Sequence, residues 1–177
     1  MRDFTRVGIE VLSTAGLQAK NKFGVTAGEH GKTYRFGEFS ATPIAVDHDV
    51  ECFAYLVHHK EMGTLFFATD CWNLHQVVKG VTQFLIEANY SDCVLDNAVR
   101  LGKTLPSLAD RVRLSHMSLE HCVEYLKMCE AEKTARTITL IHASARHLDK
   151  EVARMYVQQE FGVPTWVAEK GLEVEFN

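Results

Sequence analysis

Three side chains that can bind a metal ion, His48, Asp70 and His142, each follow a mostly apolar run of residues. Apolar runs of this length predict strands buried in a sheet, and chemistry in layered α/β proteins gathers where such strands end. Imidazole and carboxylate groups are ligands for zinc, manganese or iron, which activate water for hydrolysis. The sequence therefore predicts a hydrolytic metal site at one sheet edge, with Asp70 able to bridge two ions.

Other interpretations of single residues remain open. Asp70 alone fits equally well as a turn residue or as the N-cap of a following helix. His116, in Leu114–Ser118, precedes a predicted helix N-terminus, where it could bind an anion or donate a proton, or could simply enter the helix. Glu87 ends another apolar strand and is either a partner behind a metal ligand or a strand-end charge.

Length and composition indicate one domain, residues 1–177, with an ordinary core. The net charge is −4 with scattered basic residues, so no broad nucleic-acid-binding face is expected. No apolar run approaches the roughly 20 residues of a membrane span, and no signal peptide is recognisable. The five cysteines include no C-x-x-C pair, which indicates free thiols and a cytoplasmic protein.

Residue patterns predict strands first, then strands alternating with helices. The expected strands cover residues 7–12, 32–36, 39–46, 51–59, 64–70, 81–87, 137–142, 165–168 and 172–176, with a loop at 24–31. The expected helices cover 14–23, 74–79, 93–101, 118–130 and 149–161, and 106–113 is helical or loop-like. This order predicts an α/β architecture with a mixed sheet.

Five ordered motifs resemble the metallo-β-lactamase fold, and especially its phosphodiesterase and nuclease branch. They are Val46–Val50, Phe66–Asp70, Leu85–Asp92, Ser115–Ser118 and Leu140–Ser144. The branch includes phosphoribosyl cyclic phosphodiesterase, YycJ-type proteins and phage cyclic-nucleotide phosphodiesterases. The resemblance covers nearly the whole chain from Val7 and implies part of an αββα sandwich.

The resemblance implies a role for each matching residue. His48 and His142 would be ligands of the first and second ion, Asp70 the bridging carboxylate, and His116 the catalytic residue at the scissile phosphate or leaving group. Ser115, Asn89 and Ser144 would contact the substrate, while Glu87 and Asp92 would support the ligands from behind. The implied metals are Zn or Mn, as a dinuclear centre in the complete family.

The family's main signature, H-x-H-x-D-H, is absent from this sequence, and His30, His58 and His59 stand at the wrong places to replace it. The signature supplies four ligands and normally lies just before the segment with which this chain begins. The resemblance therefore implies that the first strands of the fold are missing and that metal binding is weak. Three explanations for the missing signature remain open. The chain could be a fragment of a full enzyme, it could be completed by another polypeptide, or it could be a natural degenerate form. An apolar sheet face or edge is expected, covered in a homodimer or by a partner chain.

Two functional hypotheses follow. The first is a metal-dependent phosphodiesterase or nuclease-like hydrolase, incomplete in this chain, that acts on a cyclic nucleotide, a cyclic phosphate or a nucleic-acid phosphodiester. The second is a metal-free binding or assembly module that retains the fold without turnover.

Overall fold

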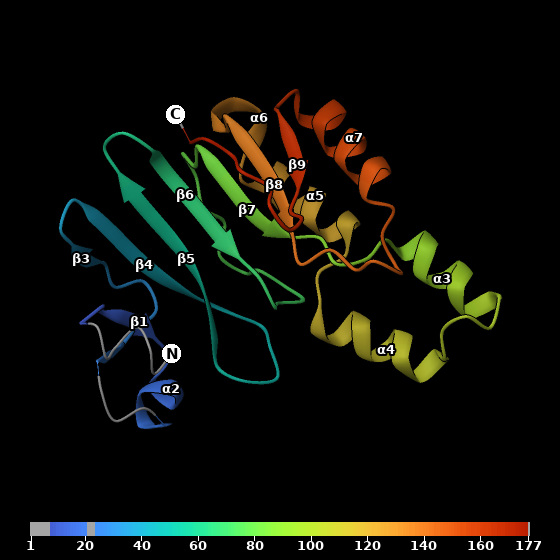
Figure 1. Cartoon of the computed structure of the whole chain (residues 1–177), viewed down its shortest axis with the longest axis horizontal. Coiled ribbons are helices and arrows are strands. Elements are labelled where there is room, and N and C mark those ends of the chain that lie inside the picture. Colours follow the sequence, from blue (N-terminus) through green and yellow to red (C-terminus); the bar gives the residue numbers. More distant parts are fainter. Residues whose placement is uncertain (1–7, 21–23, 177) are drawn as a thin grey trace.

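A mixed seven-stranded sheet forms the centre of the computed structural model, which describes residues 8–20 and 24–176 (Figure 1). Its order is β3-β4-β5-β6-β7-β8-β9. The strands are β3 (Tyr34–Phe36), β4 (Phe39–Val46), β5 (Cys52–His59), β6 (Gly63–Ala68), β7 (Gln83–Glu87), β8 (Thr137–Ile141) and β9 (Thr165–Val167). Neighbours from β3 to β6 are antiparallel and those from β6 to β9 are parallel. The predicted α/β class with a mixed sheet is confirmed.

Five helices follow β7 along the chain: α3 (Asp92–Arg100), α4 (Pro106–Ser115), α5 (Leu119–Met128), α6 (Ala131–Thr134) and α7 (Lys150–Phe161). The side chains of Ser91, Ser118 and Asp149 cap α3, α5 and α7 by accepting hydrogen bonds from backbone N–H groups. In Figure 1, α5 and α6 lie behind the sheet, whereas α3 and α4 project beyond it. Among the described residues, no helix is long and apolar enough to cross a membrane.

The main core lies between the sheet and α5, α6 and α7. Phe66, Phe84 and Ile86 are fully buried in it, and the Phe66 ring stacks on Tyr125 with centroids 5.6 Å apart. Burying each such side chain contributes about 1.5–3 kcal/mol. Because side chains alternate along a strand, Phe67 and Leu85 point to the opposite face.

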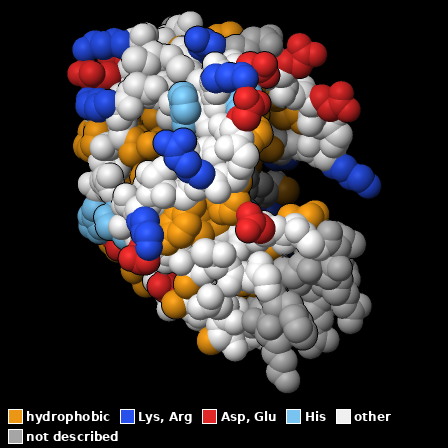
Figure 2. Space-filling view, turned by 90° about the vertical axis from the view of Figure 1, so that its left-hand side faces the viewer, with side chains coloured by type: hydrophobic (Ala, Val, Ile, Leu, Met, Phe, Trp, Pro, Cys, Tyr) orange, Lys and Arg blue, Asp and Glu red, His pale blue; other side chains and the backbone are white. Residues whose placement is uncertain are grey.

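That opposite face is apolar but only partly covered. One row across the sheet pairs Tyr55 with Phe67 and Phe67 with Leu85, and all three side chains are partly exposed and outside both hydrophobic core clusters. We call the surface formed by Tyr55, Phe67 and Leu85 the open face. Hydrophobic side chains also gather across the middle of the β3 and β4 side of the molecule (Figure 2). The expectation of an apolar, incompletely covered sheet face agrees with this arrangement.

A small parallel pair, β1 (Val11–Ser13) and β2 (Val25–Ala27), lies over one end of the open face beside α2 (Ala15–Lys20). The Tyr55 hydroxyl donates to the Leu12 carbonyl at 3.1 Å, and the Tyr34 hydroxyl donates to the Ala27 carbonyl at 3.3 Å. A Cβ atom on Gly28 would lie 2.9 Å from Cγ of Pro43, so the chain passes the sheet too closely for a side chain there. These contacts place β1 and β2 in a second layer.

Two predicted elements are wrong. Residues 74–79 are not helical: Leu74 and Val78 are buried in the core, and the Gln76 carbonyl accepts from the Tyr125 hydroxyl, so tertiary contacts replace helical ones. Residues 172–176 are not a strand, because the chain turns at Gly171 (φ +88°) and continues without pairing to a described strand.

The first strands were also misplaced. The strand expected at 7–12 is Val11–Ser13, after Gly8 at φ +79°, and residue 7 lies outside the described residues. The predicted loop at 24–31 contains β2. Residues 21–23 of the expected first helix also lie outside the described residues. The remaining predicted strands and helices are present, with ends shifted by a few residues.

Candidate metal centre

The topology brings chemically active side chains to one edge of the sheet. Strands β4 and β6 are both antiparallel to β5, and β6, β7 and β8 are parallel, so these four strands end at the same edge. His48 follows β4, Asp70 follows β6, Glu87 ends β7 and His142 follows β8. His116, the C-cap of α4, reaches the same place from outside the sheet.

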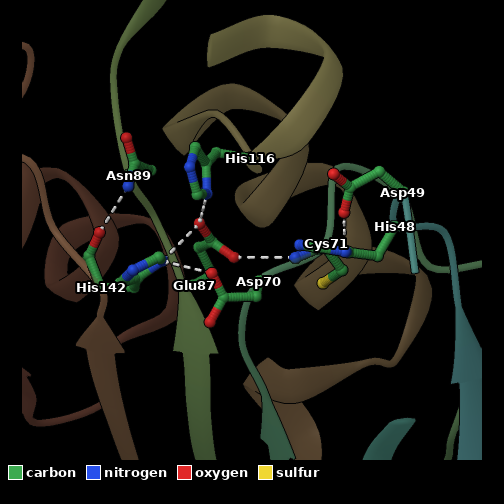
Figure 3. Close-up of polar contacts among 8 residues, drawn as sticks. All are labelled: His48, Asp49, Asp70, Cys71, Glu87, Asn89, His116 and His142. Carbon is green, nitrogen blue, oxygen red and sulfur yellow. Dashed lines mark hydrogen bonds and ion pairs between the residues drawn. The ribbon is translucent and has the colours of Figure 1, made fainter. Parts of the chain in front are cut away.

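Glu87 lies at the centre of this group with a fully buried side chain (Figure 3). Its Oε1 atom is 2.8 Å from Nδ1 of His116 and 3.0 Å from Nδ1 of His142, and its Oε2 accepts from the Cys71 backbone N–H at 3.0 Å. Nδ1 of both rings therefore carries a proton, which leaves the Nε2 lone pair of each ring for a ligand. A carboxylate behind a histidine fixes ring and tautomer in metal sites in this way.

Asp70, His116 and His142 each offer a ligand atom, and these atoms lie within 4.8 Å of one another. The Oδ1 atom of Asp70 is 3.6 Å from Nδ1 of His142, and all three side chains are partly exposed to solvent. Ligands of a tetrahedral zinc lie about 3.3 Å apart, so the three side chains would draw together slightly around an ion. Two imidazoles and one carboxylate facing solvent are a known donor set with open positions for water.

The backbone is left-handed at two of these residues. Asp70 has φ +52° and His142 has φ +56°, and among the described residues only Glu130 shares this conformation without being glycine. Such backbone costs energy for an L-residue and concentrates at functional sites. Here it occurs directly after β6 and β8, where the chain must turn.

Asn89 fixes the segments around the site. Its side-chain amide donates to the His142 carbonyl at 2.7 Å, its backbone N–H donates to the Met117 carbonyl at 2.9 Å, and its carbonyl accepts from the Ser144 N–H at 2.8 Å. The structure therefore places Asn89, expected to contact substrate, where its amide positions the backbone of His142.

The other expected substrate contacts lie beside the cluster. Ser144 Oγ accepts from the N–H groups of Arg146 and His147, which closes a local turn. Ser115 ends α4 next to His116 and is partly exposed. Asp92 was expected behind a ligand, but it is the exposed first residue of α3, and its N–H donates to Glu120.

His48 is not in the cluster that holds Asp70 and His142, although the resemblance implied that it was a ligand. Its Nδ1 atom lies 2.5 Å from Oδ1 of Asp49 and also accepts from the Val50 N–H at 3.2 Å. These contacts need opposite protonation states of Nδ1, and both direct the ring to its own loop. In Figure 3, His48 lies on the far side of Cys71 from the two clustered histidines.

The Cys71 thiol is not a candidate ligand or nucleophile at neutral pH. Burial, followed by the negative charge of Glu87, raises its pKa well above the ordinary value. The sequence did not reveal that the Cys71 N–H helps to hold Glu87 or that two histidines share this carboxylate. The signal available in the sequence was a carboxylate directly after the apolar run Phe84–Ile86.

No family model and no curated protein sequence matches the chain. Solved structures do match. YhfI from Bacillus subtilis, a metallo-β-lactamase fold protein, has a TM-score of 0.67 and 14% identity over 93% of this chain and 64% of its own. The short form of human tRNase Z has a TM-score of 0.59 and 15% identity over 96% and 68%. CmlA, a diiron β-hydroxylase from Streptomyces venezuelae, has a TM-score of 0.58 and 13% identity over 91% and 39%.

These likenesses show the metallo-β-lactamase fold. They do not fix the reaction, because a tRNA nuclease and a hydroxylase share it. The chain spans 64% of the length of YhfI.

Proposed function

We propose that the chain is a metal-dependent phosphodiester hydrolase whose ion is held by Asp70, His116 and His142. The observation that carries this proposal is the buried Glu87 carboxylate, which holds both imidazoles with Nε2 free. A buried carboxylate with only a structural role would not need hydrogen bonds from two partly exposed histidines to the same oxygen atom. Zn or Mn suits this donor set.

The chain's own residues would prepare the site before substrate arrives. Glu87 keeps both rings in one tautomer, Asn89 holds the turn after β8, and Asp70 supplies negative charge at the solvent side. A bound divalent ion would polarise a phosphoryl oxygen and lower the pKa of a water to about 7. In this proposal His116 is a ligand, so its expected role as proton donor gives way to metal binding.

Zinc titration by calorimetry tests the metal site. We expect wild-type chain to bind near one zinc, and Asp70→Asn, His116→Ala and His142→Ala each to weaken binding severely. His121→Ala is the matched control, because His121 is an exposed histidine on α5 outside the cluster. Hydrolysis of bis-p-nitrophenyl phosphate with zinc or manganese should follow the same order.

Two results would contradict the proposal. Equal zinc affinity in wild type and His142→Ala would show that zinc does not bind at the cluster of Asp70, His116 and His142. If the chain binds no metal even in excess ion, the metal-dependent hydrolase is excluded. The alternative, a metal-free binding module that retains the fold, would then be favoured.

A further inference from the structure

Three exposed basic side chains, two at the end of α3 and one after β8, lack a carboxylate partner among the described residues. Eight of the described lysines and arginines contact an acidic side chain, whereas others, among them Arg100, Lys103 and Arg146, do not. Arg100 contacts only the amide oxygen of Asn97. The nearby acidic residues Asp96 and Asp110 both contact Arg113, so their charge is already paired. These three cations are therefore available to an anion.

A buried hydrogen bond joins the two segments, distant in the sequence, that carry Lys103 and Arg146. Thr104 Oγ1 lies 3.0 Å from His147 Nε2, and both residues are buried. Lys103 directly precedes Thr104, and Arg146 directly precedes His147. The N–H groups of Lys103 and Thr104 both donate to the Ala98 carbonyl, which fixes their backbone after α3. The two exposed cations thus flank one rigid junction.

The same junction is tied to the metal cluster. Arg146 follows His142 by four residues, and its N–H donates to Ser144 Oγ. The Ser144 N–H donates to the Asn89 carbonyl, and the Asn89 amide donates to the His142 carbonyl. Short hydrogen-bonded steps therefore connect His142 to Arg146, and the Thr104–His147 contact continues the path to Lys103.

We propose that Lys103 and Arg146, with Arg100 beyond them, bind a phosphate of the substrate other than the one that reacts. This inference rests on the proposed function and extends it from a single diester to a phosphate-bearing chain such as a short oligonucleotide. Guanidinium and ammonium groups bind phosphate oxygens through charge-assisted hydrogen bonds. The cations form a small local set, so the absence of a broad basic face is compatible with them.

Metal-free binding of a fluorescein-labelled twelve-nucleotide single-stranded DNA, followed by fluorescence anisotropy, tests the site. We expect Lys103→Ala/Arg146→Ala to raise the Kd at least about tenfold and to reduce the salt slope by about 0.7, as the loss of one neutralised single-strand phosphate predicts. Arg35→Ala is the matched control, since Arg35 is an exposed cation on β3 without a carboxylate partner among the described residues. It should bind as wild type does. Circular dichroism checks that each variant is folded.

Three outcomes would overturn the inference: no DNA binding by wild type at low salt, unchanged binding by the double variant, or an equal loss in Arg35→Ala. Because binding is measured without metal, it is independent of turnover. Hydrolysis of bis-p-nitrophenyl phosphate by wild type tests the proposed function separately. If wild type does not hydrolyse bis-p-nitrophenyl phosphate but binds DNA through these cations, the proposed hydrolase function is rejected. The proposed phosphate-binding site would still stand.

Discussion

The imidazole rings of His116 and His142 lie edge to face, with their centroids 5.0 Å apart. One ring follows a helix and the other follows a strand, and no local motif relates them. They meet because both Nδ1 atoms contact the same oxygen of Glu87. A single buried charge therefore sets the orientation and tautomer of two candidate ligands, which makes Glu87 the most informative position to change.

Glu87→Gln should weaken zinc binding by about 10–100-fold, because it removes the charge that holds both rings. It should also lower the free energy of unfolding by about 1–3 kcal/mol, since the new amide would turn N–H groups towards the donors that Glu87 now accepts from. Zinc calorimetry and urea denaturation measure these effects. Glu124→Gln, an exposed change on α5, is the control. Wild-type zinc affinity in Glu87→Gln would contradict the role assigned to Glu87.

His48→Ala distinguishes the ligand set implied by resemblance from the set that the structure brings together. Because His48 contacts Asp49 and Val50 rather than the cluster, its loss should change zinc affinity by less than roughly tenfold. Calorimetry beside His142→Ala makes the comparison. A loss as large as that of His142→Ala would restore His48 to the ligand set.

Neighbouring phenylalanines on β6 test the open face. Phe66→Asp should cost more than about 3 kcal/mol of unfolding free energy, because it buries a charge in the main core. Phe67→Asp should cost much less, since Phe67 is partly exposed on the open face. Urea denaturation measures both. Equal losses would show that the face is covered.

Light scattering of wild type and Phe67→Asp addresses the expected homodimer or covering partner. A wild-type dimer that Phe67→Asp converts to monomer would identify a second copy on the open face.

Tyr90 predicts a fall in stability at high pH. Burial, followed by the charge of Asp92, raises its pKa from 10.0 to about 12. The unfolded chain loses the Tyr90 proton near pH 10, while the folded chain keeps it to about pH 12. The neutral residue therefore stabilises the fold below pH 10, and about 2 kcal/mol is lost between pH 10 and 12. Urea denaturation across this range should show a smaller fall in Tyr90→Phe than in wild type, and identical curves would contradict it.

The sequence allowed most of the fold to be predicted, because long periodic or apolar segments such as 119–128 and 137–141 fold as their patterns indicate. Short segments were harder. Residues 74–79 have a helical pattern, but burial of Leu74 and Val78 decides their conformation. The three-residue strand β2 has too little pattern to separate it from a loop.

The sequence indicated at which sheet edge the candidate residues gather, but not which of them lie together. Asp70 and His142 each follow an apolar strand, and the parallel pairing of β6, β7 and β8 brings them to one edge. Whether His48 or His116 joins them depends on how β5 and the α4 C-terminus pack, and no sequence spacing encodes that. The roles of Glu87 and Asn89 depend on hydrogen bonds across distant segments.

The left-handed backbone at Asp70 and His142 has an evolutionary consequence. An L-residue in this conformation costs about 1–2 kcal/mol, which glycine avoids, and glycine's extra freedom in the unfolded chain offsets only about 0.4–1 kcal/mol. Selection for the fold alone would therefore favour glycine at both positions, and only selection for the side chains opposes it. Among descendants of this chain, glycine at positions 70 and 142 would mark lineages that have lost the proposed metal site while keeping the scaffold.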